Sequence, residues 1–242
     1  MAAVFITLEG PDGSGKSTQA VLLAERLRRF GLPVLLTREP GGTALGLTLR
    51  QILLEPSNKL AVMTEVLLMA ADRAQHVEEV IKPALQNNMI VICDRYVDSS
   101  LAYQGFGLLQ DVAKVKTINE AAIGGLWPHL TLLLDVETET GLQRHTLASR
   151  RQGRSEGLDR IEQRDLEFHR RVRQGYNRLQ ESDPQRFAVV DTTELGVDDV
   201  AQKVWHIVRQ RLEISEPEIT CTKKEGESCE VNHCRSAGSG CK

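Results

Sequence analysis

The first feature of this 242-residue chain is the lack of a long hydrophobic run. A membrane-spanning helix needs about 20 consecutive apolar residues, and no stretch of the chain approaches that length. The N-terminal segment MAAVFITLEG has no basic region and is interrupted by Glu9, which argues against a secretory signal peptide. We therefore expect no membrane partner and a cytoplasmic location.

An excess of positive charge is also lacking. The formal net charge is −3, and 26% of the residues are charged while 41% are hydrophobic, which is the range of ordinary globular domains. A chain with this balance has no electrostatic reason to bind nucleic acid. We therefore expect no nucleic-acid partner, and the length fits one α/β domain with a small extension.

Cysteine is nearly absent from the body of the chain, where only Cys93 occurs. Four more cysteines gather in the tail, residues 213–242: Cys221, Cys229, Cys234 and Cys241. With His233 they offer soft ligands for zinc, but no CxxC pair occurs and the spacings match no standard structural site. Because the tail has few apolar residues, we predict a disordered extension that activity does not need. Metal binding is the open alternative, and residues 1–212 form the predicted domain.

Short apolar runs alternate with helical patterns along that domain. The runs cover residues 4–8, 33–37, 89–93, 130–136 and 186–191. Helical spacing follows Lys16 as far as Phe30, runs from Thr64 to Ile81 with a stop near Pro83, and returns over residues 197–212. This alternation predicts a three-layer α/β/α sandwich with a five-stranded parallel sheet.

The segment GPDGSGKST carries the strongest motif, because it matches G-x-x-x-x-G-K-[ST]. It comprises Gly10, Pro11, Asp12, Gly13, Ser14, Gly15, Lys16, Ser17 and Thr18. A predicted strand precedes it and a predicted helix follows, which disfavours a chance glycine-rich turn. Backbone N–H groups at such a helix N-terminus bind phosphate, the lysine reaches the β- and γ-phosphates, and the Ser17 hydroxyl binds Mg²⁺. The motif predicts ATP binding in a P-loop NTPase fold.

Several arginines are expected beside this loop. Arg38 and Arg95 follow predicted strands, and Arg73 lies on the helix before one. Ligands of such sheets gather beyond the carboxyl ends of the strands, and arginine forks suit phosphate. Three arginines besides Lys16 therefore predict a second phosphorylated ligand, although Arg73 taken alone is as well explained as a surface charge. Asp94 fits an acid that organises Mg²⁺, through water or directly, or a helix cap.

Five motifs together resemble the thymidylate kinase family: EGPDGSGKST, TREPGG, AADRAQH, DRYVDSSLAYQG and LDRIEQR. They occur in this order over roughly residues 3 to 212. The resemblance implies transfer of the γ-phosphate of ATP to the 5′-phosphate of dTMP, giving dTDP, with Mg²⁺ as cofactor. It also implies a homodimer.

The resemblance assigns an acceptor site to residues of these motifs. It implies that Arg73 and Arg95 grip the dTMP phosphate, that Arg38 positions the acceptor, and that Asp12 accepts a hydrogen bond from the 3′-hydroxyl. Ser100, Tyr103 and Gln104 lie where the family contacts thymine and deoxyribose. Tyr103 is alternatively an ordinary core aromatic, and Asp12 alternatively stabilises only its own loop. Family members commonly stack a phenylalanine on the base where this chain has Met69.

The resemblance also places catalytic cations. Lys16 is expected to hold the donor phosphates and Arg95 the acceptor phosphate, so that the two are in line. Some relatives carry a further arginine in the phosphate loop, where this chain has Gly13. The basic segment 149–160, within a mobile lid of about residues 144–160, then supplies it from Arg150, Arg151 or Arg154, with Arg160 nearby. A basic surface loop without this role is the alternative reading.

Two other functions fit parts of the sequence. A deoxynucleoside kinase phosphorylates a bare hydroxyl and needs fewer cations for its acceptor than this chain offers. A P-loop switch or assembly protein leaves the second phosphate site and the basic segment unexplained. Both are therefore disfavoured.

Overall fold

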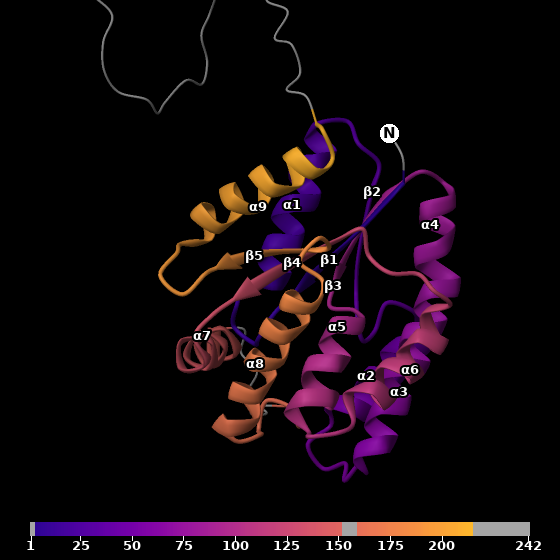
Figure 1. The fold of residues 1–242 in the computed structure, drawn as a ribbon, viewed down its shortest axis with the longest axis vertical. Coiled ribbons are helices and arrows are strands. Elements are labelled where there is room, and N and C mark those ends of the chain that lie inside the picture. The colour runs from indigo at the N-terminus through magenta and orange to yellow at the C-terminus, as the bar shows by residue number, and fades with distance from the viewer. Residues whose placement is uncertain (1–2, 152–158, 215–242) are drawn as a thin grey trace, which may run out of the picture.

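A computed structural model describes residues 3–151 and 159–214. The tail cysteines, His233, and Arg154 of the basic segment lie outside these residues. The described chain folds around a single sheet (Figure 1). None of the helices within the described ranges combines the length and the apolarity that crossing a membrane requires.

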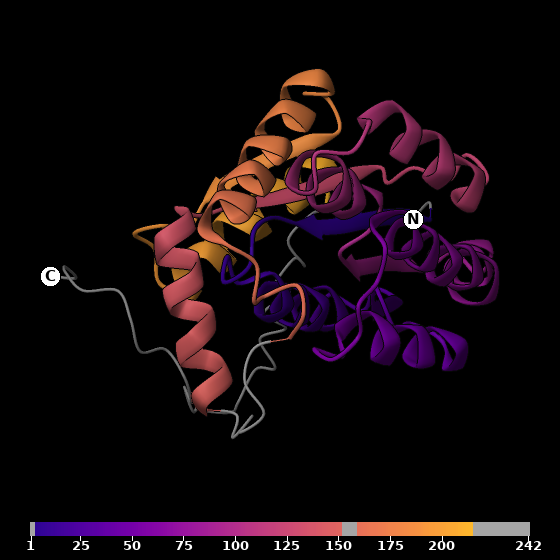
Figure 2. The same ribbon diagram turned by 90° about the horizontal axis from the view of Figure 1, so that it is seen from below.

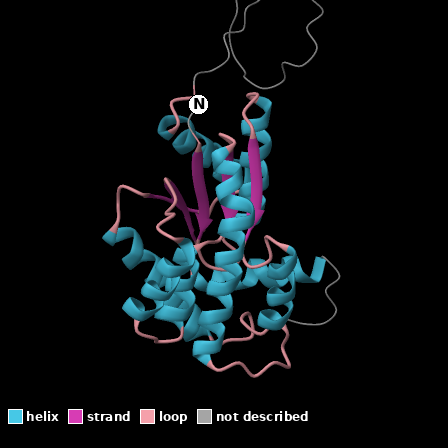
Figure 3. Cartoon of the chain, turned by 90° about the vertical axis from the view of Figure 1, so that its right-hand side faces the viewer, coloured by secondary structure: helices cyan, strands magenta, loops and turns pink. Residues whose placement is uncertain are grey.

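All five expected strands are present and run parallel, in the order β2-β3-β1-β4-β5. They are β1 (Val4–Glu9), β2 (Val34–Arg38), β3 (Ile90–Asp94), β4 (Leu130–Asp135) and β5 (Phe187–Asp191). The visible arrowheads in Figure 3 point to one end of the sheet, where helices gather. In this register Asp94 pairs with both Leu8 and Arg38, so the phosphate loop, Asp94 and Arg38 lie at the same edge.

Helices cover both faces of the sheet. They are α1 (Lys16–Arg29), α2 (Ala44–Leu54), α3 (Val62–His76), η1 (Val77–Ile81), α4 (Lys82–Gln86), α5 (Val97–Ser100), η2 (Leu101–Gly107), α6 (Val112–Ile123), α7 (Thr138–Arg151), α8 (Leu166–Ser182) and α9 (Val197–Arg211), with η1 and η2 being π-helical. Figure 2 shows α7 at the periphery beside α8.

The hydrophobic core has one large cluster on each side of the sheet. Ile6 and Leu8 face α1 and α9, whereas Phe5 faces α3, η1 and α6. Alternate side chains of β1 thus enter opposite clusters, as expected for a strand buried on both faces. The predicted three-layer α/β/α sandwich is confirmed.

One predicted helix end is wrong. Pro83 does not end its helix, because the helical run continues through η1 and α4 to Gln86. Pro83 lies in the first turn of α4, after a π-helical turn, where a missing N–H is tolerated. At the other end, Ile214 packs into the cluster of α1 and α9 with 7% of its surface exposed. The packed body therefore extends two residues beyond Leu212.

Candidate active site at the carboxyl edge of the sheet

One cavity of about 820 Å³ opens at the carboxyl edge of the sheet. The phosphate loop and the start of α1 line it, from Asp12 to Gln19. The predicted acceptor residues also line the cavity: Arg38, Met69, Arg73, Arg95, Ser100, Tyr103 and Gln104, together with Asp94, which was predicted to organise magnesium. Arg144, Thr192, Leu195 and Val197 line another part. Residues predicted from four separate motifs are thus brought together around one space.

The phosphate loop has the predicted strand–loop–helix context. Gly15 caps the N-terminus of α1 with a left-handed φ of 94°, a conformation that favours glycine. The Lys16 ammonium donates to the Pro11 carbonyl at 2.7 Å and to Ser14 Oγ at 3.3 Å. Burial, with the nearby Arg95 charge, lowers the pKa of Lys16 to about 8. Lys16 is therefore partly deprotonated near pH 8, where a bound polyphosphate would restore its charge.

Gly13 occupies the loop position where some relatives have arginine. Its φ is +75°, and a Cβ built there would lie 1.9 Å from the Gly141 carbonyl oxygen on α7. A side chain at this position collides with helix backbone, so the structure gives a steric reason for the absence of an arginine here.

Ser17 and Asp94 form the oxygen pair predicted to hold magnesium. The Ser17 hydroxyl donates to Asp94 Oδ2 at 2.5 Å. The other oxygen, Oδ1, is buried without a hydrogen-bond partner among the described residues. Hydroxyl and carboxylate oxygens are ligands that Mg²⁺ prefers, and an unpartnered buried carboxylate oxygen is costly without a cation or water. These residues therefore fit a magnesium ion.

Arg95 follows β3 with a left-handed backbone, φ 73°, which costs energy for a residue other than glycine. Its guanidinium donates to Gly10 O (3.3 Å), Ser99 Oγ (3.2 Å), Tyr176 OH (3.4 Å), Tyr103 OH (3.1 Å) and Asp12 Oδ1. Its side chain is 21% exposed, so it still reaches the cavity. A strained backbone held by this many contacts indicates a positioned functional group.

Asp12 forms an ion pair with Arg95. The position of Asp12 in the phosphate loop gave no indication of this partner. Burial acts to raise the pKa of Asp12, but the charges of Arg95 and Lys16 outweigh it, and the pKa is lowered from its usual value. Asp12 is therefore an anion at neutral pH, sitting between the loop lysine and the acceptor-side arginine.

Glu9 is connected to Arg95 through two shared hydrogen-bond partners. From the sequence, no role in the site was predicted for Glu9. Fully buried, it accepts hydrogen bonds from Tyr96 N–H (2.7 Å), Ser99 Oγ (2.6 Å) and Tyr176 OH (3.1 Å). Two of these groups, Ser99 and Tyr176, in turn accept from Arg95. Burial and the Asp98 charge raise the pKa of Glu9 to about 7. The only signal in the sequence was its place at the carboxyl end of the first strand.

Arg73 is held more tightly than a free phosphate ligand. With 2% of its side chain exposed, it donates to Glu39 Oε2 (2.7 Å), Ser100 Oγ (2.9 Å), Tyr96 O (2.9 Å) and Asn119 Oδ1. A guanidinium has five N–H groups, so these four contacts leave one. The prediction that Arg73 grips a phosphate stays a prediction, with a single donor available.

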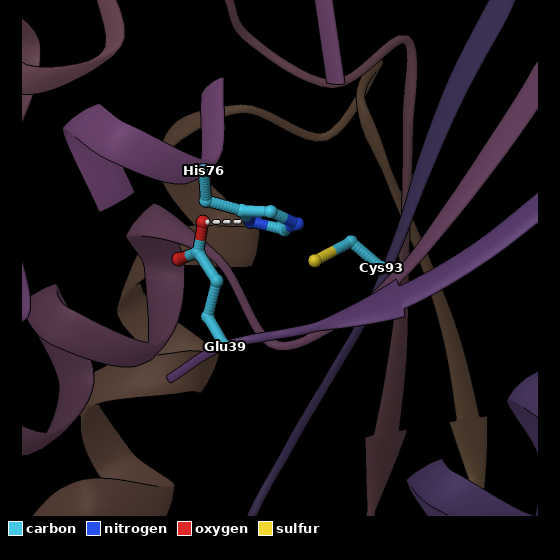
Figure 4. A group of neighbouring side chains, drawn as sticks. All are labelled: Glu39, His76 and Cys93. Carbon is cyan, nitrogen blue, oxygen red and sulfur yellow. Dashed lines mark hydrogen bonds and ion pairs between the residues drawn. The ribbon is translucent and has the colours of Figure 1, made fainter. Parts of the chain in front are cut away.

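Glu39 is itself held by His76, beside Cys93 (Figure 4). Ligand-type atoms of these three buried residues lie within 4.8 Å of one another. His76 Nδ1 pairs with Glu39 Oε1 at 2.8 Å, and the Cys93 thiol donates to the Arg95 carbonyl at 3.0 Å. Burial raises the pKa of that thiol well above its usual value. Because these atoms already have partners and the thiol is neutral, we interpret the cluster as support for Arg73.

The far end of the cavity is apolar and aromatic. Tyr103 is 6% exposed, packs with Phe168 and Tyr176, and has the Arg95 guanidinium 4.9 Å from its ring centroid. Tyr103 belongs to a core cluster and also lines the cavity, and its contact with a nucleotide stays a prediction. Met69 packs against the same cluster. Arg38 is exposed at the cavity.

The predicted lid is described only in part. Arg150 and Arg151 form the C-terminal end of α7, but their side chains, like the whole of Arg154, lie outside the described residues. Arg160 instead pairs with Glu65 at 2.7 Å, with 12% of its side chain exposed. Their catalytic roles stay predictions.

A parallel sheet whose first strand enters a phosphate loop at a helix N-terminus, facing a second cation-lined site, defines a P-loop nucleotide-binding protein. Comparison with known proteins narrows the class. Residues 8–204 match the family described as thymidylate kinase, and the chain belongs to that family. The resemblance drawn from the five motifs, and with it the class of nucleoside monophosphate kinases, is confirmed.

Individual proteins similar to this chain are also thymidylate kinases. The thymidylate kinase of Synechococcus sp. (strain JA-2-3B'a(2-13)) is 48% identical over 212 residues, 88% of this chain and 97% of that protein. The thymidylate kinase of Thermomicrobium roseum is 50% identical over 206 residues, 85% of this chain and 94% of its own. The crystal structure of thymidylate kinase from Ehrlichia chaffeensis has a TM-score of 0.70 at 33% sequence identity, and the match covers 86% of this chain and 99% of that chain.

Proposed function

We propose that the protein transfers the γ-phosphate of ATP to dTMP, giving dTDP. One observation supports this most: the phosphate loop and three arginines, Arg38, Arg73 and Arg95, line the same cavity. A donor nucleotide alone needs only the loop. The arginines suit a second, phosphorylated ligand, and the names of the relatives identify that ligand as thymidylate.

In this reaction an oxygen of the 5′-phosphate of dTMP bonds to the γ-phosphorus of ATP while the bond from that phosphorus to the β–γ bridging oxygen breaks. The acceptor is already anionic, so the protein positions reactants and neutralises charge. Lys16 binds the donor phosphates, and Arg95, with Arg38, binds the acceptor phosphate. Arg73 adds its one remaining N–H. Ser17 and Asp94 would hold Mg²⁺, which supplies positive charge to the donor phosphates.

The proposal also includes arginines of the basic segment 149–160, which would neutralise charge on the phosphates. We assign Arg150, Arg151 or Arg154 to the phosphates because the loop backbone at Gly13 has no room for a side chain. The dispensable tail and the cytoplasmic location stay predictions beside it.

A steady-state assay with dTMP, dUMP, thymidine and dCMP as acceptors tests the function. We expect dTMP to give the highest kcat/KM, with ADP formed one for one with the diphosphate. Preference for thymidine would identify a deoxynucleoside kinase instead. ADP formation independent of any acceptor would point to a switch or an ATPase.

The lowered pKa of Lys16 predicts that ATP binding takes up protons. At pH 8 about half of the Lys16 side chains are neutral in the free protein, and the bound phosphates should raise the pKa, so about half a proton enters per ATP. Calorimetric titrations in buffers of different ionisation enthalpy measure this uptake. The Lys16→Arg variant, always charged, should show none. Equal heats in all buffers for the wild type would contradict the prediction.

We further propose that the protein is a homodimer through α2 and α3. These neighbouring helices expose the large apolar side chains Leu45 (49%), Leu47 (53%) and Leu67 (52%), and exposed apolar surface of this kind suits association with a second copy. The Leu67→Glu variant should sediment as a monomer at micromolar concentration. Leu147→Glu on α7, where the leucine is also 52% exposed, is the matched control and should leave the mass unchanged. A wild-type monomer would refute the proposal.

A further inference from the structure

Glu65 is a buried carboxylate to which sequence reasoning gave no role. It lies on α3 with 2% of its side chain exposed. Its Oε1 accepts a hydrogen bond from Gln104 Nε2 at 2.9 Å, and its Oε2 pairs with Arg160 and Arg164, both at 2.7 Å. A carboxylate between two guanidinium groups and an amide is fully used by the protein, so it acts on the cavity only through a neighbour.

That neighbour is Gln104, which lines the cavity in η2. An amide has a donor end and an acceptor end, whereas a carboxylate only accepts. The amide nitrogen must therefore face Glu65. The Gln104 carbonyl oxygen accepts no hydrogen bond from the described part of the chain and is the end left to accept one from a ligand.

This orientation distinguishes pyrimidine bases. Thymine and uracil carry a donor, N3–H, on the edge where cytosine carries an acceptor, N3. If the Gln104 carbonyl oxygen lies opposite position 3 of the base, it can accept a hydrogen bond from the N3–H of thymine or uracil. With cytosine the same oxygen would face N3, which is also an acceptor, and no hydrogen bond could form. A buried polar group left unpaired costs about 1–3 kcal/mol, and sites built around such a group reject the wrong ligand strongly.

We propose that Glu65 is the positioning residue that sets base specificity, by holding Gln104 as a hydrogen-bond acceptor for the N3–H of the acceptor base. The proposal rests on the proposed function, since it assumes a nucleoside monophosphate in the acceptor site. It adds the residue that fixes the orientation of the Gln104 amide. Glu65 touches no reacting atom, and its effect is on selectivity.

The Glu65→Gln variant tests the proposal. A glutamine accepts as well as donates, so the Gln104 amide becomes free to turn. We expect the ratio of kcat/KM for dTMP over dCMP to fall at least tenfold, mainly through KM. The ratio of dTMP over dUMP should stay within twofold, because both bases carry N3–H. If kcat/KM fell by the same factor for dTMP, dUMP and dCMP, Glu65 would have a merely structural role and the proposal would be overturned.

Two kinds of control separate orientation from charge. Arg160→Met and Arg164→Met each remove one ion pair of Glu65 but keep its contact with Gln104, and the dTMP over dCMP ratio should stay within twofold of wild type. The double variant Glu65→Gln/Gln104→Glu exchanges the partners, again places an acceptor at the base and keeps the local charge. It should recover most of the lost selectivity.

The outcomes are distinguishable from a failure of the proposed function. If the wild type does not phosphorylate dTMP, the proposed function fails. If it prefers dTMP and Glu65→Gln keeps that preference over dCMP, only the role of Glu65 fails. Should Glu65→Gln not fold, the charge-conserving double variant decides, because a folded double variant without dTMP preference contradicts the proposal.

Discussion

Replacing Arg95 by methionine is expected to lower kcat with dTMP about 10³-fold, the range found when a charged group at a transferring phosphoryl is lost. Arg95 lies between the phosphate loop and the acceptor side, and its donors are oriented by Ser99, Tyr103 and Tyr176. The Michaelis constant for ATP should change less than threefold, since Lys16 and the loop backbone remain. Steady-state and single-turnover kinetics measure both effects.

Controls are needed because Arg95 also balances buried carboxylates. Its removal leaves Asp12 without an ion-pair partner, which is destabilising, so thermal unfolding must show a folded variant at the assay temperature. Arg95→Lys keeps a charge but loses the fork, and we expect an intermediate loss. Arg170→Met, at an exposed arginine on α8 that pairs with Glu139 and Glu167, should leave kcat unchanged. A less than tenfold loss for Arg95→Met would remove Arg95 from the catalytic machinery.

The Asp12→Asn variant should lower kcat/KM for dTMP about 10²-fold, because the charge-assisted hydrogen bond to the 3′-hydroxyl and the ion pair with Arg95 are both weakened. The dissociation constant of ATP should change less than threefold. Equal losses for dTMP and ATP would mean that Asp12 serves only its own loop.

An acceptor without the 3′-hydroxyl separates the two roles of Asp12. Wild-type enzyme should use dideoxythymidine monophosphate poorly, and Asp12→Asn should lower that residual rate little further. If the variant loses the same factor with both acceptors, Asp12 acts through Arg95 and not through the hydroxyl. Measuring kcat/KM for wild type and Asp12→Asn, each with dTMP and with the dideoxy acceptor, gives the coupling energy between the Asp12 carboxylate and the 3′-hydroxyl.

The sequence predicted those parts of the site that lie at element ends. Short apolar runs located the strands, and parallel strands bring their following residues to one edge, so Arg38, Asp94 and the phosphate loop were placed together correctly. Periodicity also located α1 and α9. The end of the second helical run was misjudged because a π-helical turn accommodates Pro83, and hydrophobic spacing does not reveal such a turn.

Partners brought together from distant segments could not be predicted. Tyr176 lies 167 residues from Glu9 and yet donates to it, and Glu65 meets Arg164 across 99 residues. Nothing in the local pattern around Glu65, a charged residue in an amphipathic helix, distinguishes it from a solvated one. The family resemblance assigned Arg73 to the acceptor phosphate, whereas four of its hydrogen bonds go to other protein groups.

The contact of Gly13 with α7 bears on how the family can change over time. A Cβ at Gly13 would meet the Gly141 carbonyl, and a Cβ at Gly141 would lie 2.5 Å from the Asp12 carbonyl, so neither glycine can be replaced while the other segment stays in place. A lineage that moved its extra cation into the phosphate loop by one substitution would pass through a protein with a displaced helix. A change from one arrangement to the other would therefore need a shift of α7 together with the substitution at Gly13.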